Sequence, residues 1–249
     1  MKHKLILLGL PLFAIVLFFV VLLILFRDHP VESVRISDLT DTSVTISWTT
    51  VNEQLAAVEY YQEGSNEVMT AFDTRDLVKN SSGQYELSEQ GRATRNIHYV
   101  VIRNLNPDTT YTFSIKNAGN FNEQTIKTYP TLASVNSPMP IYGKVVNYMA
   151  DSPNPNDGVI FYRIHNKADD SPLTNYYSSL ISADSTWSGD LSNLRDNSGA
   201  VLKVNEETHI LDVEVTSDTG KGWQQLNLIE RLPAEDILVN IRYITDETN

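Results

Sequence analysis

From residue 31 onward, the sequence contains many short runs in which apolar and polar residues alternate, and this period of two restricts what the chain can fold into. The stretch HILDVEVTS, residues 209–217, shows it most clearly, with Leu211, Val213 and Val215 in one phase. Successive side chains of a β-strand point to opposite faces, so the pattern is typical of a half-buried strand. No window after residue 27 carries a convincing apolar run at helical spacing. The sequence therefore predicts an all-β protein.

The alternating runs fall into two sets, separated by the proline-containing segment YPTLASVNSPMP at residues 129–140. Seven short runs in about 100 residues, each bounded by turn residues, favour a β-sandwich. We predict strands near residues 33–39, 43–50, 56–62, 67–73, 97–105, 110–117 and 122–131. The second set is predicted near residues 140–147, 159–166, 175–183, 186–191, 200–204, 210–217, 223–230 and 237–244. We therefore expect two tandem β-sandwich domains, at residues 28–131 and 140–249, joined by a linker at residues 132–139.

The first 27 residues differ from the rest, because Leu5 to Phe26 form an apolar run of 22 residues without a charge. About 20 apolar residues span a bilayer as a helix, which predicts a transmembrane helix at residues 5–26. The alternative, a cleaved signal peptide, has a shorter apolar core of about 7–15 residues and a small-residue cleavage site. Lys2 and Lys4 precede the run, so the positive-inside rule predicts a cytoplasmic stub and extracytoplasmic domains.

Composition excludes several classes of chemistry. The chain has no cysteine, which excludes disulfides, thiolate metal sites and a catalytic thiol. Its formal net charge is −12. Beyond residue 27, 16 basic residues face 31 acidic ones, a net charge of −15. Such a surface repels phosphate backbones, so we expect no nucleic-acid partner.

Trp48, in SVTISWTT at residues 43–50, is predicted to fill the core of the first domain. Leu105, a turn and then Tyr111 follow the pattern of a tyrosine corner, in which the phenol bonds back to upstream backbone. With these residues, 31–131 resembles a fibronectin type III domain. VTISWTTVNEQLAAVEYY and HYVVIRNLNPDTTYTFSI are most similar to the variant that precedes the catalytic domain of purple acid phosphatases.

The second set of strands resembles the carboxypeptidase regulatory-like β-sandwich, which is related in shape to transthyretin. The segments that carry this resemblance are MPIYGKVVN, NDGVIFYRI and YYSSLISADSTWSGDLSNLR. The family's pattern falls on Gly143, Val145, Gly158, Val159, Asp184 and Trp187. The glycine usual in the Asp turn is absent, since the sequence there is ADSTW. The resemblance implies that Trp187 is a core residue.

No motif predicts catalysis. The five histidines are His3, His29, His98, His165 and His209, and none has a second ligand close in sequence, so we expect strand-surface or turn residues rather than zinc ligands. The metal-binding motifs of purple acid phosphatases, a Gly-Asn-His stretch among them, do not occur, and neither does a serine-hydrolase elbow or a phosphate-binding loop. DSPNPNDG, residues 151–158, is predicted to be a stiff turn, with calcium binding as the alternative. We expect no enzyme, no cofactor and no metal.

Residues 74–95 form a 22-residue connection between predicted strands. Connections longer than about 12–15 residues are commonly functional or disordered. Arg75, Lys79, Arg92 and Arg95 make it locally basic, which suggests a contact loop for an anionic partner. The alternative is an extra hairpin or a floppy insertion.

These features predict a single-pass membrane protein whose extracytoplasmic domains bind a protein or glycan of the cell envelope, as an adhesion or scaffold protein at the cell surface. The alternative is an accessory, non-catalytic subunit of a cell-envelope hydrolase, because both resemblances are to domains that flank hydrolases. A structural spacer is a third possibility. Sandwich folds host many functions, so the ligand cannot be read from the fold.

Overall fold

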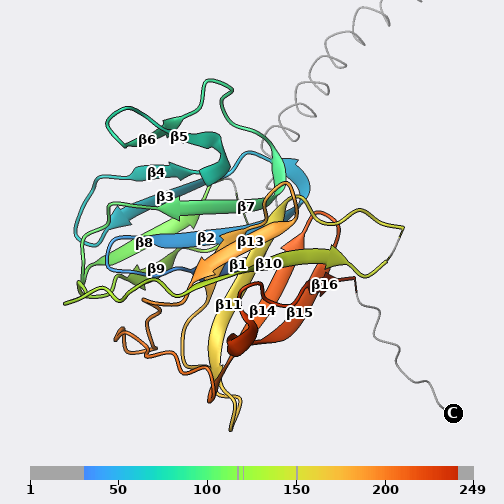
Figure 1. Ribbon diagram of the computed structural model, residues 1–249. Coiled ribbons are helices and arrows are strands. Elements are labelled where there is room, and N and C mark those ends of the chain that lie inside the picture. Colours follow the sequence, from blue (N-terminus) through green and yellow to red (C-terminus); the bar gives the residue numbers. More distant parts are fainter. Residues whose placement is uncertain (1–30, 117, 120, 150, 241–249) are drawn as a thin grey trace, which may run out of the picture.

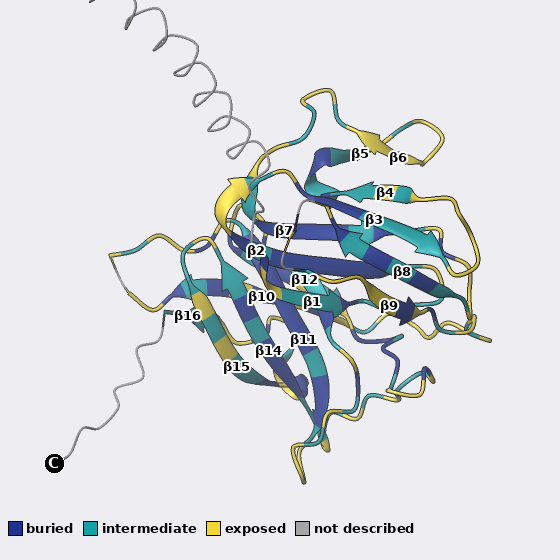
Figure 2. Cartoon of the chain, turned by 180° about the vertical axis from the view of Figure 1, so that it is seen from behind, coloured by how far each residue is buried: buried dark blue, intermediate teal, exposed yellow. Residues whose placement is uncertain are grey.

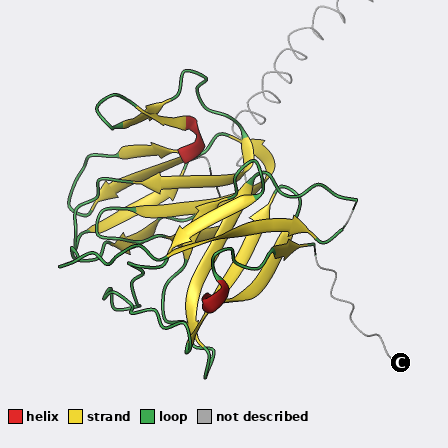
Figure 3. Ribbon diagram, viewed as in Figure 1, coloured by secondary structure: helices red, strands yellow, loops and turns green. Residues whose placement is uncertain are grey.

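The computed structural model describes residues 31–240, apart from residues 117, 120 and 150, and shows an all-β protein (Figure 3). Two short 3-10 helices, η1 (Thr74–Asp76) and η2 (Leu228–Glu230), interrupt the strands. The predicted transmembrane segment at residues 5–26 lies outside the described residues. Among the residues that are described, no helix has the length and apolar character needed to cross a membrane.

The N-terminal half contains two sheets that enclose one core (Figure 1). The first sheet has the order β1-β2-β7 and the second the order β4-β3-β8-β9. The strands are β1 (Val31–Ser37), β2 (Val44–Gln54), β3 (Ala57–Gln62), β4 (Met69–Phe72), β7 (Arg95–Ile102), β8 (Thr110–Ile115) and β9 (Gln124–Lys127). Alternate residues of β2 turn inward, and Val44, Ile46 and Trp48 are buried in the cluster between the sheets. The alternation seen in the sequence therefore defines this core.

The C-terminal half also has two sheets around a core of its own. One has the order β13-β10-β16 and the other the order β12-β11-β14-β15. Strand β16 pairs in parallel with β10, whereas the other pairs of this half are antiparallel. The strands are β10 (Pro140–Asn147), β11 (Gly158–Asn166), β12 (Tyr177–Leu180), β13 (Thr186–Asp190), β14 (His209–Ser217), β15 (Lys221–Asn227) and β16 (Ile237–Val239).

The two halves lie against each other, and the β1-β2-β7 sheet faces the β12-β11-β14-β15 sheet (Figure 1, Figure 2). Each of these sheets turns one face to its own core and the other toward its neighbour. On β2, Thr45 and Ser47 alternate with the core residues and are nevertheless buried. These small polar side chains contribute to the junction between the halves, which the alternation alone did not predict.

Residues 74–95 form an extra hairpin, one of the alternatives expected for this connection, in which η1 leads into β5 (Leu77–Lys79) and β6 (Tyr85–Leu87). One predicted strand differs from the structure. The predicted strand at 200–204 is not one; only an isolated bridge joins Val201 to Arg195. A tight turn in which Ser198 and Ala200 donate backbone hydrogen bonds to the Asp196 carboxylate accounts for this local shape.

Candidate functional site

The junction between the halves has an apolar centre. Ile97 and Tyr99 of β7 pack against Val159 and Phe161 of β11 in a separate hydrophobic cluster. All four side chains sit at positions that alternate with core residues, so they belong to the outer faces of their sheets. Burial of these apolar groups on both sides stabilises the contact between the halves.

One end of the junction is closed by a polar network around Ser178. The Ser178 amide and hydroxyl both donate to the Asp38 carboxylate, the amide at 2.9 Å. The same hydroxyl lies 2.8 Å from the Ser37 hydroxyl and 3.0 Å from that of Tyr99. The Asp38 amide in turn donates to the Tyr176 carbonyl at 3.0 Å. Burial raises the pKa of Asp38, and it also raises the pKa of Tyr99.

Tyr176 links this network to an ion pair between Arg35 of β1 and Glu214 of β14. The Arg35 guanidinium also stacks over Phe161, 4.7 Å from the ring centre, and over Tyr176 at 4.9 Å. Tyr176 donates a 2.6 Å hydrogen bond to Glu214. Burial alone would raise the pKa of Glu214, but hydrogen bonds from Arg35 and Tyr176 outweigh it and hold that pKa below its ordinary value.

A second arginine crosses the junction at its flank. Arg75 donates to Asp73 within its own half and to Asp157 of the C-terminal half. It also donates to the Ile97 carbonyl. Burial would raise the pKa of Asp73, but its bonds to Arg75 hold that pKa below the usual value. Arg75 therefore contributes to the contact between the halves.

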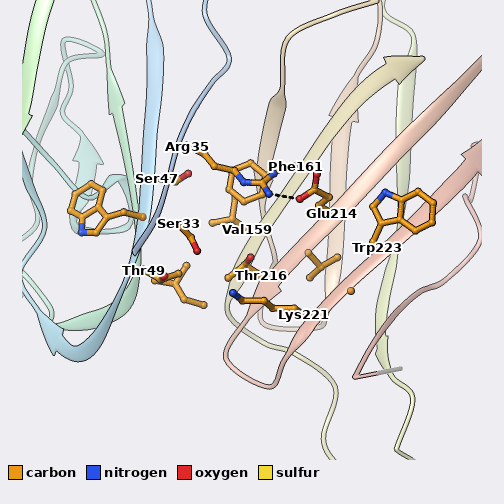
Figure 4. A pocket seen from close by; sticks show the side chains of 14 residues that line it. Ser33, Arg35, Ser47, Thr49, Val159, Phe161, Glu214, Thr216, Lys221 and Trp223 are labelled. Carbon is orange, nitrogen blue, oxygen red and sulfur yellow. Dashed lines mark hydrogen bonds and ion pairs between the residues drawn. The ribbon is translucent and has the colours of Figure 1, made fainter. Parts of the chain in front are cut away.

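Beside the Arg35–Glu214 pair, the sheets diverge and leave a groove with a cavity of about 200 Å³ (Figure 4). One wall comes from β1 and β2, and the other from β14 and β15. In Figure 4, Ser47 and Thr49 lie on the first side, Thr216 and Lys221 on the second, and the ion pair spans the space between them. The lining residues are Ser33, Arg35, Ser47, Trp48, Thr49, Ile97, Val159, Phe161, Glu214, Val215, Thr216, Lys221, Gly222 and Trp223.

The groove combines apolar surface with hydrogen-bond donors. Trp223 is 48% exposed, although tryptophan is usually well buried. The Ser47 hydroxyl and the Nη1 atom of Arg35 are buried and have no partner among the described residues. An apolar cleft with a few polar groups suits ligand recognition. The lining has no histidine or cysteine to serve as a base or nucleophile. Elsewhere in the described ranges, no cluster of three His, Cys, Asp or Glu side chains is placed to bind a metal ion.

The predicted core residues of the first domain lie in the interior. Trp48 is 3% exposed and stacks on His98, with ring centres 4.7 Å apart. Leu105 is buried in the same cluster. Tyr111 is also buried, and its hydroxyl accepts a 2.9 Å hydrogen bond from the Asn106 amide, the geometry of a tyrosine corner.

Trp187 lies in the core of the C-terminal half, among residues such as Ile141 and Leu191. Gly143 allows this placement, because a Cβ at that position would lie 3.2 Å from the Trp187 indole nitrogen. The family resemblance predicted that Trp187 is a core residue. Gly143, which lies opposite it, explains how the large indole fits there.

Two histidines expected at strand surfaces or in turns are buried instead. His98 packs on Trp48 in the core, where burial lowers its pKa to about 4. His165 lies between two carboxylates, 3.1 Å from Asp170 and 3.1 Å from Asp212. Both lie on strands, His98 on β7 and His165 on β11, and both are buried.

The predicted contact loop uses most of its cations internally. Arg95 pairs with Asp76 at 2.8 Å. Arg92 donates to the Ala56 carbonyl and stacks on Phe72, while Arg75 joins the halves as described. Lys79 lies over the Tyr85 ring at 5.3 Å. Contact with an anionic partner would therefore depend on Lys79 and the hairpin.

The hairpin β5–β6 borders a second, larger cavity of about 750 Å³. Tyr85 and Leu87 are exposed beside it, and Arg103 of the neighbouring segment stacks on Tyr85 at 4.2 Å. This cavity lies between the hairpin and the N-terminal half only. It lacks the buried unpartnered donors that mark the groove at the junction.

The groove residues escaped prediction because they come from strands far apart in the sequence. Two signals for them are present. Small polar residues, rather than charged ones, occupy the outer phase of β2 at Thr45, Ser47 and Thr49. Trp223 stands in phase with Lys221 and Gln225, on the polar face of its strand.

Comparison with known families identifies the first half of the described chain. Residues 31–131 match the family model described as the purple acid phosphatase N-terminal domain. That domain is a non-catalytic, fibronectin type III-like β-sandwich. The match covers about two-fifths of the chain and confirms the predicted resemblance over those residues. The carboxypeptidase regulatory-like character of residues 140–249 stays a prediction. A search of curated proteins finds no match.

Solved structures that match this chain in a structure search include the sensor domain of the anti-sigma factor RsgI4 of Pseudobacteroides cellulosolvens. That match has 21% identity and a TM-score of 0.27, and it covers 43% of this chain and 97% of that one. A second is the FN1–FN3 region of chicken CNTN1, at 13% identity and a TM-score of 0.27. It covers 84% of this chain and 65% of that one. Similarity at this level says nothing about ligands.

Proposed function

We propose that this chain is a membrane-anchored binding protein without catalytic activity, whose two domains are held outside the cytoplasm. The groove at the junction is the observation that carries the proposal, because both halves contribute to its walls and it pairs an exposed indole with unpartnered donors. Sites between domains are preferred positions for ligands. The expected partner is a protein or glycan of the cell envelope.

The proposed organisation has a cytoplasmic stub and anchor at residues 1–27, then sandwiches at 28–131 and 140–249 joined by 132–139. The apolar run at residues 5–26 supports the anchor, and the lysines before it support an N-terminus in the cytoplasm. The net charge of −15 beyond residue 27 would keep the domains away from an anionic membrane surface.

Site-specific crosslinking of the full chain in the native envelope tests this function. A photo-crosslinking residue at Thr216, in the groove, is compared with one at Lys203, an exposed position outside it. We expect the same adduct repeatedly from position 216 and none from position 203. Equal capture from both positions, or recovery of the full chain in the soluble cytosolic fraction, would contradict the proposal.

Absence of catalysis is tested separately with the purified full chain. We expect no hydrolysis of phosphoesters, peptides or glycosides above background, with or without added divalent metals. Metal-dependent turnover that a His98 or His165 substitution abolishes would overturn this part of the proposal.

An accessory subunit of a cell-envelope hydrolase is the second candidate. The match of residues 31–131 to the N-terminal domain of purple acid phosphatases favours it, because that domain accompanies a catalytic one. Under this alternative, the adduct at position 216 would be a hydrolase, and the two proteins would co-purify from solubilised membranes. A glycan or non-enzymatic adduct would exclude it.

A further inference from the structure

Two hydrogen-bonding groups without partners lie buried beside the groove. Ser47 is 2% exposed, and its hydroxyl makes no hydrogen bond among the described residues. The buried Nη1 atom of Arg35, from the neighbouring strand, is in the same condition. Both atoms are covered by the surrounding protein, so the contacts open to a ligand are the other lining groups of the groove.

The charge balance of the groove favours an anionic ligand. Glu214 is the acidic residue of the lining, and Arg35 and Tyr176 already occupy its oxygens. Lys221, at the start of β15, has no ion pair or side-chain hydrogen bond within the described part of the chain. The groove therefore carries a net positive charge within a chain of net charge −12. The positive charge of the groove and its hydrogen-bond donors both favour a negatively charged ligand group that is rich in acceptors.

The apolar part of the groove adds a flat surface. The half-exposed Trp223 indole lies beyond Glu214 in Figure 4, and Val159 and Phe161 line the base. A pyranose ring presents C–H groups on one face and hydroxyls around its rim, so it matches an aromatic face beside donors. A cavity of about 200 Å³ is smaller than a typical drug pocket and suits a single sugar ring.

We propose that this groove binds a sugar residue that carries a carboxylate, such as a hexuronate within an envelope glycan. Its ring lies against Trp223, and its carboxylate is bound by Lys221 beside the Arg35–Glu214 pair. This inference rests on the proposed function, because it assigns a ligand class to the same groove.

Direct binding to the purified full chain, in a detergent without sugar groups, tests the inference. The probes are methyl glucuronide, methyl glucoside, acetate and an N-acetylated Asp–Glu peptide. The readout is acrylamide quenching of tryptophan fluorescence. It reports mainly on Trp223, because Trp48 and Trp187 are 3% and 2% exposed. We expect methyl glucuronide to protect Trp223 from quenching at a concentration at least tenfold lower than any other probe requires.

Three substitutions assign the contacts. Calorimetric titration replaces quenching for Trp223→Ala, which removes the reporter. We expect Trp223→Ala to weaken glucuronide binding at least tenfold, and Ser47→Ala, which removes a covered hydroxyl, to leave it unchanged. Lys221→Gln should reduce glucuronide affinity to that of the glucoside. The matched controls are Tyr142→Ala, whose ring is 46% exposed outside the groove, and Lys203→Gln, and both should bind as the original chain does.

Several outcomes would overturn the inference. Equal affinity for the glucoside would show that the carboxylate does not contribute to binding. Equal affinity for acetate would show that the sugar ring does not contribute. Equal affinity for the peptide would identify the ligand as an acidic protein. The inference would also be overturned if glucuronide did not bind, or if Lys221→Gln and Trp223→Ala left its binding unchanged. If position 216 still captures an envelope partner, the proposed function stands and only the ligand class fails.

Discussion

The two faces of strand β2 are both buried, yet they contact different parts of the molecule. Val44, Ile46 and Trp48 face the core of the N-terminal half. Thr45 and Ser47 face the C-terminal half, where they adjoin the apolar cluster and the groove. The first face is dry and closely packed, whereas the second keeps an unpartnered hydroxyl.

This difference separates stability from recognition. A face of large apolar residues stabilises the fold through the surface it removes from water. A face of small hydroxyl residues lets another sheet approach closely and leaves hydrogen-bonding groups available where that sheet turns away. We infer that the inner face of β2 holds its own half together, and that its outer face sets the geometry between the halves.

The largest effect is expected from Trp48→Ala. Removing a buried indole should cost about 3–5 kcal/mol and unfold the N-terminal half at ordinary temperatures. Thermal or chemical denaturation followed by circular dichroism measures it. Trp223→Ala is the control, because this exposed indole lies on the groove, and its loss should change the free energy of unfolding by no more than about 0.5 kcal/mol. Similar losses from both variants would contradict the distinction between core and groove.

The next effect concerns pH. His98 has a folded-state pKa of about 4, below its ordinary 6.5, because it is buried against Trp48. The unfolded chain therefore binds a proton at a higher pH than the folded chain does. The stability linked to His98 is present above pH 6.5 and is lost as the pH falls toward 4, by about 3 kcal/mol.

Denaturant titrations at several pH values measure this loss. His98→Gln should flatten the dependence of the unfolding free energy on pH across that window, whereas His209→Gln, at a partly exposed site where burial also lowers the pKa, should flatten it less. An unchanged acid slope in His98→Gln would show that another group causes it.

Ser178→Ala perturbs the junction while leaving both cores intact. It removes the hydroxyl bonds to Asp38, Ser37 and Tyr99, and we expect a cost of about 2 kcal/mol. We expect faster proteolysis between residues 129 and 140 than in the original chain, without loss of the β-sheet signal in circular dichroism. Ser188→Ala, at an exposed position on β13, is the control and should behave like the original chain. Global unfolding of Ser178→Ala at the same denaturant concentration as Trp48→Ala would contradict the division.

The smallest effect is expected at the tyrosine corner. Tyr111→Phe removes the acceptor of the Asn106 amide and should cost about 1 kcal/mol. Tyr61→Phe is the matched control, because the Tyr61 hydroxyl bonds to Glu123 at the exposed surface and its loss should be close to neutral. Chemical denaturation resolves the difference between the two variants.

Sequence reasoning succeeded where a local pattern decides the structure. Alternation defined most strands, and the Leu105–turn–Tyr111 spacing indicated the tyrosine corner before any contact was visible. The hairpin in residues 74–95 was kept only as an alternative, because its strands are three residues each and mostly exposed. Short exposed strands carry little periodic signal.

The junction and its groove could not be predicted, for a physical reason. Serine and threonine on the outer face of a strand are compatible both with water and with contact to a second sheet. The sequence alone therefore does not show which of the two Ser47 contacts. Partners such as Arg35 and Glu214 lie 179 residues apart, and no local rule pairs them. The groove exists only where the two halves meet, so the sequence of either half alone does not indicate it.

A cysteine pair tests most directly whether the outer face of the β1-β2-β7 sheet is covered by the C-terminal half. The chain has no cysteine, so Ser37→Cys with Ser178→Cys introduces a single pair at hydroxyls 2.8 Å apart. Mild oxidation of the full chain should close an intramolecular disulfide and block thiol labelling. The control, Ser37→Cys with the exposed Ser188→Cys, should stay reduced. Two free thiols in the first variant that label as fast as the thiol at position 188 would contradict the docked arrangement and the groove that depends on it.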